Sequence, residues 1–241
     1  MRFVTGHPMT LDVNKVTIKT SLTACFGQNF LELEGADDFM EALAHHSEEI
    51  SLDAQEYIFM ENDASDYVYI LISGVIMLER STQKGSRHVF AFLFTGNLLG
   101  ISEFSYYSFS AKALTNATVV KISKQLIKGI FDNHPQFAQR LHEFTNHILS
   151  NILDQLFVMG QKTAHQRLAH FLLDMRHRIG HGTETFFLPM SRQDIADYLG
   201  MSLETASRGF SSLKRKGLIS IESNYQITVL DHQQLAEYAE S

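Results

Sequence analysis

The stretch Ser191–Gly217, SRQDIADYLGMSLETASRGFSSLKRKG, decides the fold because it holds two short helix patterns joined by a glycine. Ser191 is a suitable N-cap, and Asp194 places a carboxylate in the first turn of the first helix. Gly200 can adopt the left-handed conformation that ends a helix, and Ser202 can cap the next one. Apolar residues then recur at helical spacing at Ala206, Phe210 and Leu213. The stretch predicts a helix-turn-helix.

The opposite face of the second helix carries side chains that suit DNA. Early positions of a recognition helix reach base edges, whereas late positions lie near the phosphate backbone. Arginine donates a pair of hydrogen bonds to guanine, glutamate accepts one from the cytosine amine, and serine can do either. The residues expected to contact DNA are Glu204, Ser207, Arg208, Ser191, Arg192, Ser202, Thr205, Ser211, Lys214, Arg215 and Lys216. The alternative is the solvated face of an ordinary amphipathic helix.

Two short β-prone runs follow, Leu218–Ser220 and Tyr225–Val229, around a turn signal at Glu222–Asn224. Two helices followed by a hairpin form a winged helix-turn-helix. This winged helix-turn-helix resembles the DNA-binding domain of the Crp/Fnr family of bacterial transcription regulators.

The spacing E-x-x-S-R, at Glu204, Ser207 and Arg208, is similar to the Fnr branch, which reads TTGA-type half-sites. The resemblance implies that these three residues read bases. The cyclic-AMP receptor branch has an additional arginine before the glutamate, and this chain has Leu203 there.

Length and composition limit the class of protein. A chain of 241 residues can bury two cores, and 44% hydrophobic with 20% charged residues is ordinary for a globular protein. No apolar run approaches the length of a membrane span, and the first residues lack the apolar core of a signal peptide. We therefore expect a cytoplasmic protein. The one cysteine, Cys25, excludes an internal disulfide and a multi-cysteine metal site within one chain.

The net charge of −7 is unevenly distributed. Residues 1–160 hold 11 Lys and Arg against 18 Asp and Glu, whereas residues 161–241 hold 9 of each. The acidic excess belongs to the N-terminal part, and the basic side chains of the C-terminal part concentrate on the second helix of the motif. A DNA-binding face needs such a local positive stripe rather than a basic chain.

From about residue 48 to residue 123 the pattern changes to short β-prone runs separated by turn signals. The runs are Tyr57–Phe59, Tyr67–Ile72, Val75–Leu78, His88–Phe94 and Thr118–Ile122. Strands at this spacing predict an antiparallel sandwich or a small barrel. The segment resembles the family's sensor β-roll, and Gly96–Gly100 resembles its G-D-x-x-G turn. Gln55 and Asn62 stand where the family usually has glycine, so those two turns are expected to differ.

The cofactors of family members are not expected here. In nucleotide-binding relatives, the turn is followed by glutamate and then by an Arg-Ser/Thr-Ala cluster, whereas this chain has Ile101 and Tyr107-Ser108-Phe109, with Lys112 as the nearby cation. A buried phosphate needs an arginine and backbone amides, so cyclic AMP is disfavoured. The iron–sulfur cluster of the Fnr branch needs several cysteines and is disfavoured too. Haem, an apolar ligand or no ligand at all stay open, because residues 101–109 are aromatic.

Metal sites and catalytic residues are not expected either. His177 and His181 have i, i+4 spacing, but they end a helix before Gly182 and no cysteine or carboxylate cluster completes a site. A cupin-type enzyme would need a His-x-His pattern with a following glutamate and histidine, which the chain lacks. The sequence predicts no enzyme.

A long helix is expected from Pro135, which suits a first helical turn, to Gly160. An apolar stripe recurs along it at three- and four-residue steps, and Leu149, Leu153 and Phe157 widen it. We expect a parallel homodimer through this helix, as in the family, which places two recognition helices one DNA turn apart. The expected interface residues are Phe137, Leu141, Phe144, Ile148, Ile152, Leu156 and Met159.

The sequence thus predicts an α+β chain with a cyclic-nucleotide-binding-like β-roll (a jelly roll), a long dimerisation helix and a C-terminal winged helix-turn-helix. The expected parts are an N-terminal segment (1–45), the sensor β-roll (46–132), the dimerisation helix (133–160) and the DNA-binding domain (161–241). The expected function is that of a homodimeric transcription regulator, activator or repressor, on TTGA-like inverted repeats, independent of cyclic AMP. Double-stranded DNA and RNA polymerase are its implied partners. The alternative is a constitutive DNA-binding regulator whose β-roll is only a scaffold.

Overall fold

The computed structural model describes residues 15–82, 85–102, 104–222 and 225–240. The turns expected at Lys84-Gly85 and Glu222–Asn224 lie partly outside these residues. The chain divides into two compact units, the first formed by Met1–Arg80 with Ala91–Leu149 and the second by Ser81–Phe90 with Ser150–Ser241. The end of one hairpin thus belongs to the second unit.

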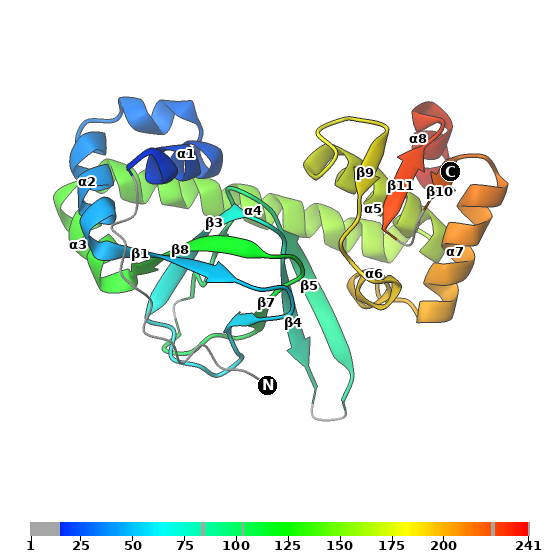
Figure 1. The fold of residues 1–241 in the computed structure, drawn as a ribbon, viewed down its shortest axis with the longest axis horizontal. Helices are drawn as coiled ribbons and strands as arrows, with labels where there is room; N and C mark the ends of the chain where they lie inside the picture. Colours follow the sequence, from blue (N-terminus) through cyan, green and yellow to red (C-terminus); the bar gives the residue numbers. More distant parts are fainter. Residues whose placement is uncertain (1–14, 83–84, 103, 223–224, 241) are drawn as a thin grey trace. The chain divides into compact units, whose positions relative to one another are not determined.

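The first unit consists of a β-roll with helices before and after it in the chain (Figure 1). Its elements, of which the end of β4 and the start of β5 fall in the second unit, are α1 (Lys15–Phe26), η1 (Gln28–Glu32), α2 (Ala36–His46), β1 (Ser47–Leu52), β2 (Tyr57–Phe59), β3 (Tyr67–Ser73), β4 (Ile76–Ser81), β5 (Arg87–Leu93), β6 (Leu98–Leu99), β7 (Ser110–Ala113), β8 (Ala117–Ser123) and α3 (Lys124–Asn133). One sheet has the strand order β1-β8-β3-β6, and the other has the order β2-β7-β4-β5. The strand pairs are antiparallel, as the sequence predicts.

The sheet that contains β3 and β8 is buried on both faces. Side chains alternate along a strand, so successive residues enter different cores. Val68 and Ile70 join a core with the N-terminal helices, which includes Ile18, Leu22, Phe30, Phe39 and Phe137. Tyr69 and Leu71 join a second core with the facing sheet, which includes Ile76, Leu78, Ala111 and Ala113. This double burial explains why β3 reads as a nearly continuous apolar run.

The two turns without glycine keep the backbone conformation that glycine favours. Gln55 has a φ of 76° and Asn62 has a φ of 73°, both in the left-handed region. The Gln55 side chain is exposed, and its backbone N–H donates to the Ala113 carbonyl at 2.7 Å. A left-handed conformation costs about 1–2 kcal/mol for most residues, and asparagine tolerates it better. The strain at Gln55 is therefore larger than the strain at Asn62.

Replacing Gln55 with glycine is expected to raise the free energy of unfolding by about 0.5–1 kcal/mol. The relief of the left-handed strain exceeds the extra chain entropy that glycine brings to the unfolded state. Urea unfolding followed by circular dichroism measures the change. Gln55→Ala keeps a Cβ and is the matched control, so equal midpoints for the alanine and glycine variants would show that the backbone is not strained there.

The second unit contains the elements of the expected winged helix-turn-helix. They are α5 (Ala164–Arg178), β9 (Thr185–Phe187), α6 (Arg192–Tyr198), α7 (Leu203–Arg215), β10 (Ile219–Ile221), β11 (Gln226–Val229) and α8 (His232–Glu240). The three strands form one antiparallel sheet in the order β10-β11-β9. Its buried residues include Leu168, Leu172, Met175, Ile195, Phe210, Leu213 and Ile227.

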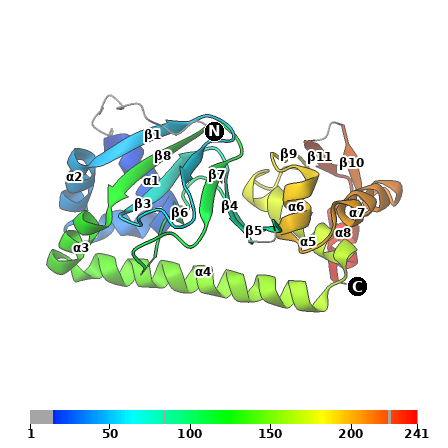
Figure 2. The same cartoon turned by 90° about the horizontal axis from the view of Figure 1, so that it is seen from below.

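Helix α4 (Pro135–Gln161) is a single helix of 27 residues and contributes to both units (Figure 2). Phe137 is 1% exposed and lies in the core of the first unit, where its ring is 4.7 Å from that of Phe39. The expectation that Phe137 contacts a partner chain is therefore wrong, because the helix begins inside its own core. Further along, α4 exposes large apolar side chains: Ile148, Leu149, Ile152, Leu153, Leu156 and Phe157. We call these six residues the α4 stripe.

Candidate nucleic-acid interface

Both helices of the motif begin at the expected capping residues. The Ser191 hydroxyl accepts a hydrogen bond from the backbone N–H of Asp194 at 3.1 Å, and the Asp194 carboxylate accepts one from the Ser191 backbone N–H at 2.9 Å. This reciprocal pair is a capping box. The Ser202 hydroxyl accepts from the backbone N–H of Thr205 at 3.2 Å. Gly200, between the helices, has a φ of 60°. The local signals of the sequence therefore set both helix starts.

Helix α7 lies close to α5 because of a glycine that the sequence analysis did not single out. A Cβ on Gly209 would come within 2.7 Å of Leu168 Cδ2, so any larger residue would force the buried Leu168 side chain to shift. Arg167 on α5 donates from Nη1 to the Leu199 carbonyl at 2.5 Å, which ties α5 to the turn between α6 and α7. Both contacts fix the orientation of α7.

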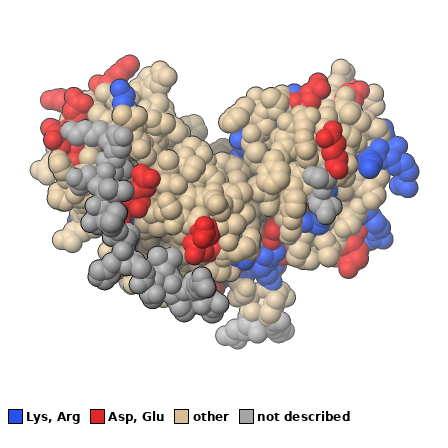
Figure 3. Space-filling view, viewed as in Figure 1, with Lys and Arg blue, Asp and Glu red and all other residues tan. Residues whose placement is uncertain are grey.

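The outer face of α7 exposes most of the predicted DNA-contacting residues. Lys and Arg side chains gather at the right-hand edge of Figure 3, over α7. The buried face of the helix consists of Ala206, Gly209, Phe210 and Leu213. The exposed predicted residues are Ser202, Glu204, Ser207, Arg208, Ser211, Lys214, Arg215 and Lys216. The structure thus brings the three expected base readers and the three basic residues together on one helix.

The first two turns of α7 hold charged groups in place. The pKa of Glu204 is lowered by a hydrogen bond from its own backbone N–H, then by the Ser202 hydroxyl and by the positive charge of Arg208. Arg208 Nη2 lies 3.4 Å from Thr205 Oγ1. Glu204 is therefore ionised at neutral pH, as an acceptor for a cytosine amine requires.

Three of the predicted DNA-contacting residues are half-buried and contact other residues of the protein. Ser191 and Thr205 are half-buried and take part in the caps of α6 and α7. The guanidinium of Arg192 lies over the Phe210 ring, with 3.3 Å between Cζ and the ring centroid. Burial lowers the pKa of Arg192 to about 10. Arg192 therefore joins α6 to α7. The sequence did not predict this contact, because Phe210 lies eighteen residues further along the chain.

Aromatic side chains pack together in the core of the β-roll around Tyr107. Tyr107, which the sequence pattern places where nucleotide-binding relatives are expected to have arginine, is 2% exposed and stacks on Phe59 with 3.8 Å between ring centroids. Its hydroxyl donates to the Tyr67 carbonyl at 2.7 Å. Lys112 lies over the ring of Tyr57, 5.4 Å from its centroid. A buried phosphate needs a charged donor that faces it, whereas Tyr107 is uncharged and its hydroxyl already donates to a backbone carbonyl.

Metal and redox chemistry receive no support from the described residues. Within them, no group of three His, Cys, Asp or Glu side chains could hold a metal ion. Cys25 is half-buried, and burial raises the pKa of its thiol. A thiolate, the reactive form of cysteine, is therefore disfavoured at neutral pH.

Known proteins resemble this chain over both units. The Crp-like helix-turn-helix domain matches residues 166–238, and the cyclic nucleotide-binding domain matches residues 49–134. The transcriptional activatory protein AadR of Rhodopseudomonas palustris is 37% identical over 194 residues, 79% of this chain and 80% of that protein. The nitrogen fixation regulation protein FixK of Bradyrhizobium diazoefficiens is 34% identical over 180 residues, 73% of this chain and 76% of that protein.

A solved structure agrees with the fold. The structure of FixK2 from Bradyrhizobium japonicum has a TM-score of 0.75 and 30% sequence identity, and the match covers 80% of this chain and 96% of that one. Among the described residues, no helix combines the length and the apolarity that crossing a membrane requires.

Proposed function

This chain belongs to the Crp/Fnr family of transcription regulators, and on that premise we propose that it binds TTGA-like inverted repeats as a homodimer. The family regulates transcription through its DNA-binding helix-turn-helix and does not consist of enzymes. The observation that supports the proposed site is the joint exposure of Glu204, Ser207 and Arg208 on the outer face of α7. Their side chains have the donors and acceptors that base edges in a major groove require.

The α4 stripe supports the dimer. Leu156 is 62% exposed and Phe157 is 65% exposed, and large apolar side chains this exposed along one helix gain stability when a second copy covers them. A two-fold axis along α4 would present two copies of α7 to successive turns of DNA. We also propose that the regulator contacts RNA polymerase and acts in the cytoplasm. The division into four parts at residues 45, 132 and 160 stays a prediction.

The proposed regulator does not depend on cyclic AMP, because Tyr107 fills the place of the phosphate-binding arginine. The β-roll then binds another ligand, such as haem or an apolar molecule, or it binds no ligand at all. If there is no ligand, the β-roll is a scaffold for a constitutive DNA-binding protein. Operator affinity with and without oxidants, nitric oxide and apolar ligands, together with an absorbance spectrum of the purified protein, separates the two cases.

Cyclic AMP is expected to leave both the thermal midpoint and the operator affinity unchanged. A ligand that binds only the folded state raises the midpoint as its concentration exceeds its dissociation constant, so a missing shift reports missing binding. Thermal scans and fluorescence anisotropy measure the two quantities, with a nucleotide-binding family member as the positive control. A midpoint that rises with nucleotide concentration would contradict the assignment of Tyr107.

The proposed function is tested with two duplexes. One carries a TTGA inverted repeat whose half-sites are centred one helical turn apart, and the other has half a turn of DNA inserted between them. The insertion rotates one half-site away from the second copy of α7, so binding should weaken by about 10²–10⁴-fold. Equal affinity for both duplexes would exclude the dimeric reading of the site.

A further inference from the structure

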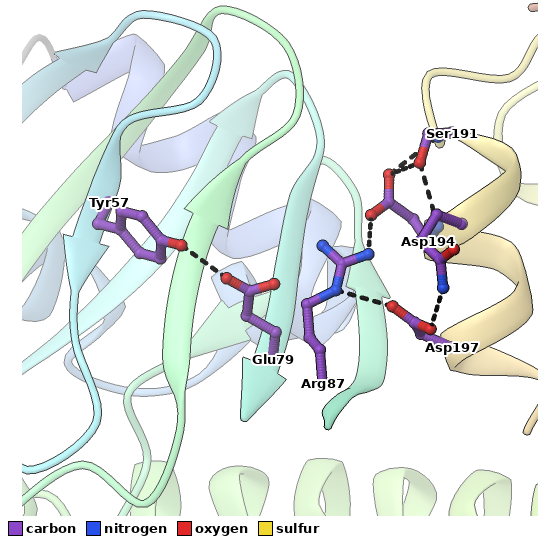
Figure 4. Close-up of polar contacts among 7 residues, drawn as sticks. Tyr57, Glu79, Arg87, Ser191, Asp194 and Asp197 are labelled. Carbon is purple, nitrogen blue, oxygen red and sulfur yellow. Dashed lines mark hydrogen bonds and ion pairs between the residues drawn. The ribbon is translucent and has the colours of Figure 1, made fainter. Parts of the chain in front are cut away.

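An arginine that lies far from the helix-turn-helix in the sequence contacts its first helix. Arg87, at the start of β5, lies in the hairpin segment Ser81–Phe90 that belongs to the second unit. Its Nη2 donates to Asp194 Oδ1 at 2.6 Å, and its Nε donates to Asp197 Oδ2 at 2.7 Å (Figure 4). The two carboxylates are one turn apart on α6, so the fork of the guanidinium spans that turn.

Both carboxylates are also bound from their own helix. Asp194 Oδ2 accepts from the backbone N–H and the hydroxyl of Ser191, at 2.9 and 2.6 Å, and Asp197 Oδ1 accepts from Gln193 Nε2 at 2.6 Å. The side chains of Asp194 and Asp197 are 11% and 13% exposed, against 29% for Arg87. The ion pairs are thus shielded from solvent far better than a surface salt bridge.

The guanidinium keeps its charge in this position. Burial lowers the pKa of Arg87, but the hydrogen bonds to Asp197 and Asp194 outweigh burial and raise it. Without Arg87, Asp194 and Asp197 would keep their hydrogen bonds but lose their positively charged partner in a poorly solvated place, which is unfavourable.

The two carboxylates lie on α6, the first helix of the helix-turn-helix. In a helix-turn-helix, the first helix crosses the sugar–phosphate backbone while the second lies in the groove. Without Arg87, the negative charges of Asp194 and Asp197 on that first helix would repel phosphates. With Arg87 in place, its positive charge offsets this repulsion.

We propose that Arg87 is a positioning residue for DNA binding: it neutralises Asp194 and Asp197 and thereby lets α6 approach the phosphate backbone. This inference rests on the proposed function. It assigns to a side chain of the β4–β5 hairpin a contribution to affinity that is independent of base sequence.

The test measures affinities of the full chain for an operator and for an unrelated duplex by fluorescence anisotropy. Arg87→Ala should weaken both by the same factor, about three- to tenfold, the effect of a unit charge across roughly 15 Å near a protein surface. The factor should shrink as salt is raised, because screening reaches exposed phosphates. Arg80→Ala is the matched control, since Arg80 lies in the same hairpin and donates instead to Glu61 at 2.7 Å. It should leave both affinities unchanged.

A second variant separates charge from structure. Asp197→Asn in the Arg87→Ala background removes one unpaired carboxylate and should restore part of the affinity, and Asp197→Asn alone should not weaken binding. Unchanged or higher affinity of Arg87→Ala, a loss that ignores salt, or a loss that Asp197→Asn fails to restore would overturn the proposal. Arg208→Ala, measured in parallel, tells the two failures apart. If it too has no effect on base discrimination, the proposed function fails, whereas if only Arg87→Ala is silent, this inference alone fails.

Discussion

Arg208→Ala is expected to lose discrimination at the guanine of the TTGA half-site by about 1–3 kcal/mol, the value of one bidentate contact between arginine and a base. Arg208 is exposed on α7, and its approach to Thr205 Oγ1 at 3.4 Å orients the guanidinium before DNA arrives. The loss should therefore appear at one base position, and binding to duplexes without that guanine should change little. Affinities for a set of duplexes with single base changes measure it.

Lys214→Ala is the matched control for Arg208→Ala. Lys214 lies in the last turn of α7, where a phosphate contact is expected, so its loss should weaken all duplexes alike and reduce the salt dependence. An equal loss on every duplex for Arg208→Ala would mean that Arg208 contacts phosphate and reads no base.

Leu156→Glu is expected to separate the proposed dimer and to weaken operator binding by about 10²–10⁴-fold. Leu156 is 62% exposed and lies near the C-terminal end of the α4 stripe. A glutamate at this position would have to be desolvated in the interface. Each monomer would then bind one half-site without the gain in effective concentration that two linked sites provide. Analytical ultracentrifugation measures the oligomeric state, and anisotropy measures the affinity.

Asn151→Glu gives the same charge on the same helix outside the stripe, at an exposed position. It should stay dimeric and bind normally. A Leu156→Glu variant that remains a dimer with full affinity would place the interface elsewhere in the chain.

The helix-turn-helix was predictable because its signals are local. Ser191, Gly200 and Ser202 act within a few residues of their own positions, and each has the capping or left-handed role that its residue type favours. The β-roll strands were predictable where they are buried on both faces, as β3 is. Strand β1 was not expected, because its sequence SEEISL is largely polar and it exists through pairing with β8.

Helix α1 was also missed, since its buried apolar residues Ile18 and Leu22 lie among threonines and lysines, which is a weak helical pattern. The contacts that the sequence could not reveal are those between distant segments. Arg87 lies more than one hundred residues before Asp194, and no spacing rule connects them. Phe137 fits the helical stripe of α4, but whether its partner is a second chain or the chain's own Phe30 and Phe39 is decided only by the tertiary fold.

Selection of binding sites from random duplex DNA by the full chain tests the central claim most directly. If Glu204, Ser207 and Arg208 read bases from two symmetry-related copies of α7, the recovered sequences will share a TTGA-like inverted repeat with half-sites centred one helical turn apart. Recovered sequences with no repeated element, or with a single unpaired site at full affinity, would contradict it.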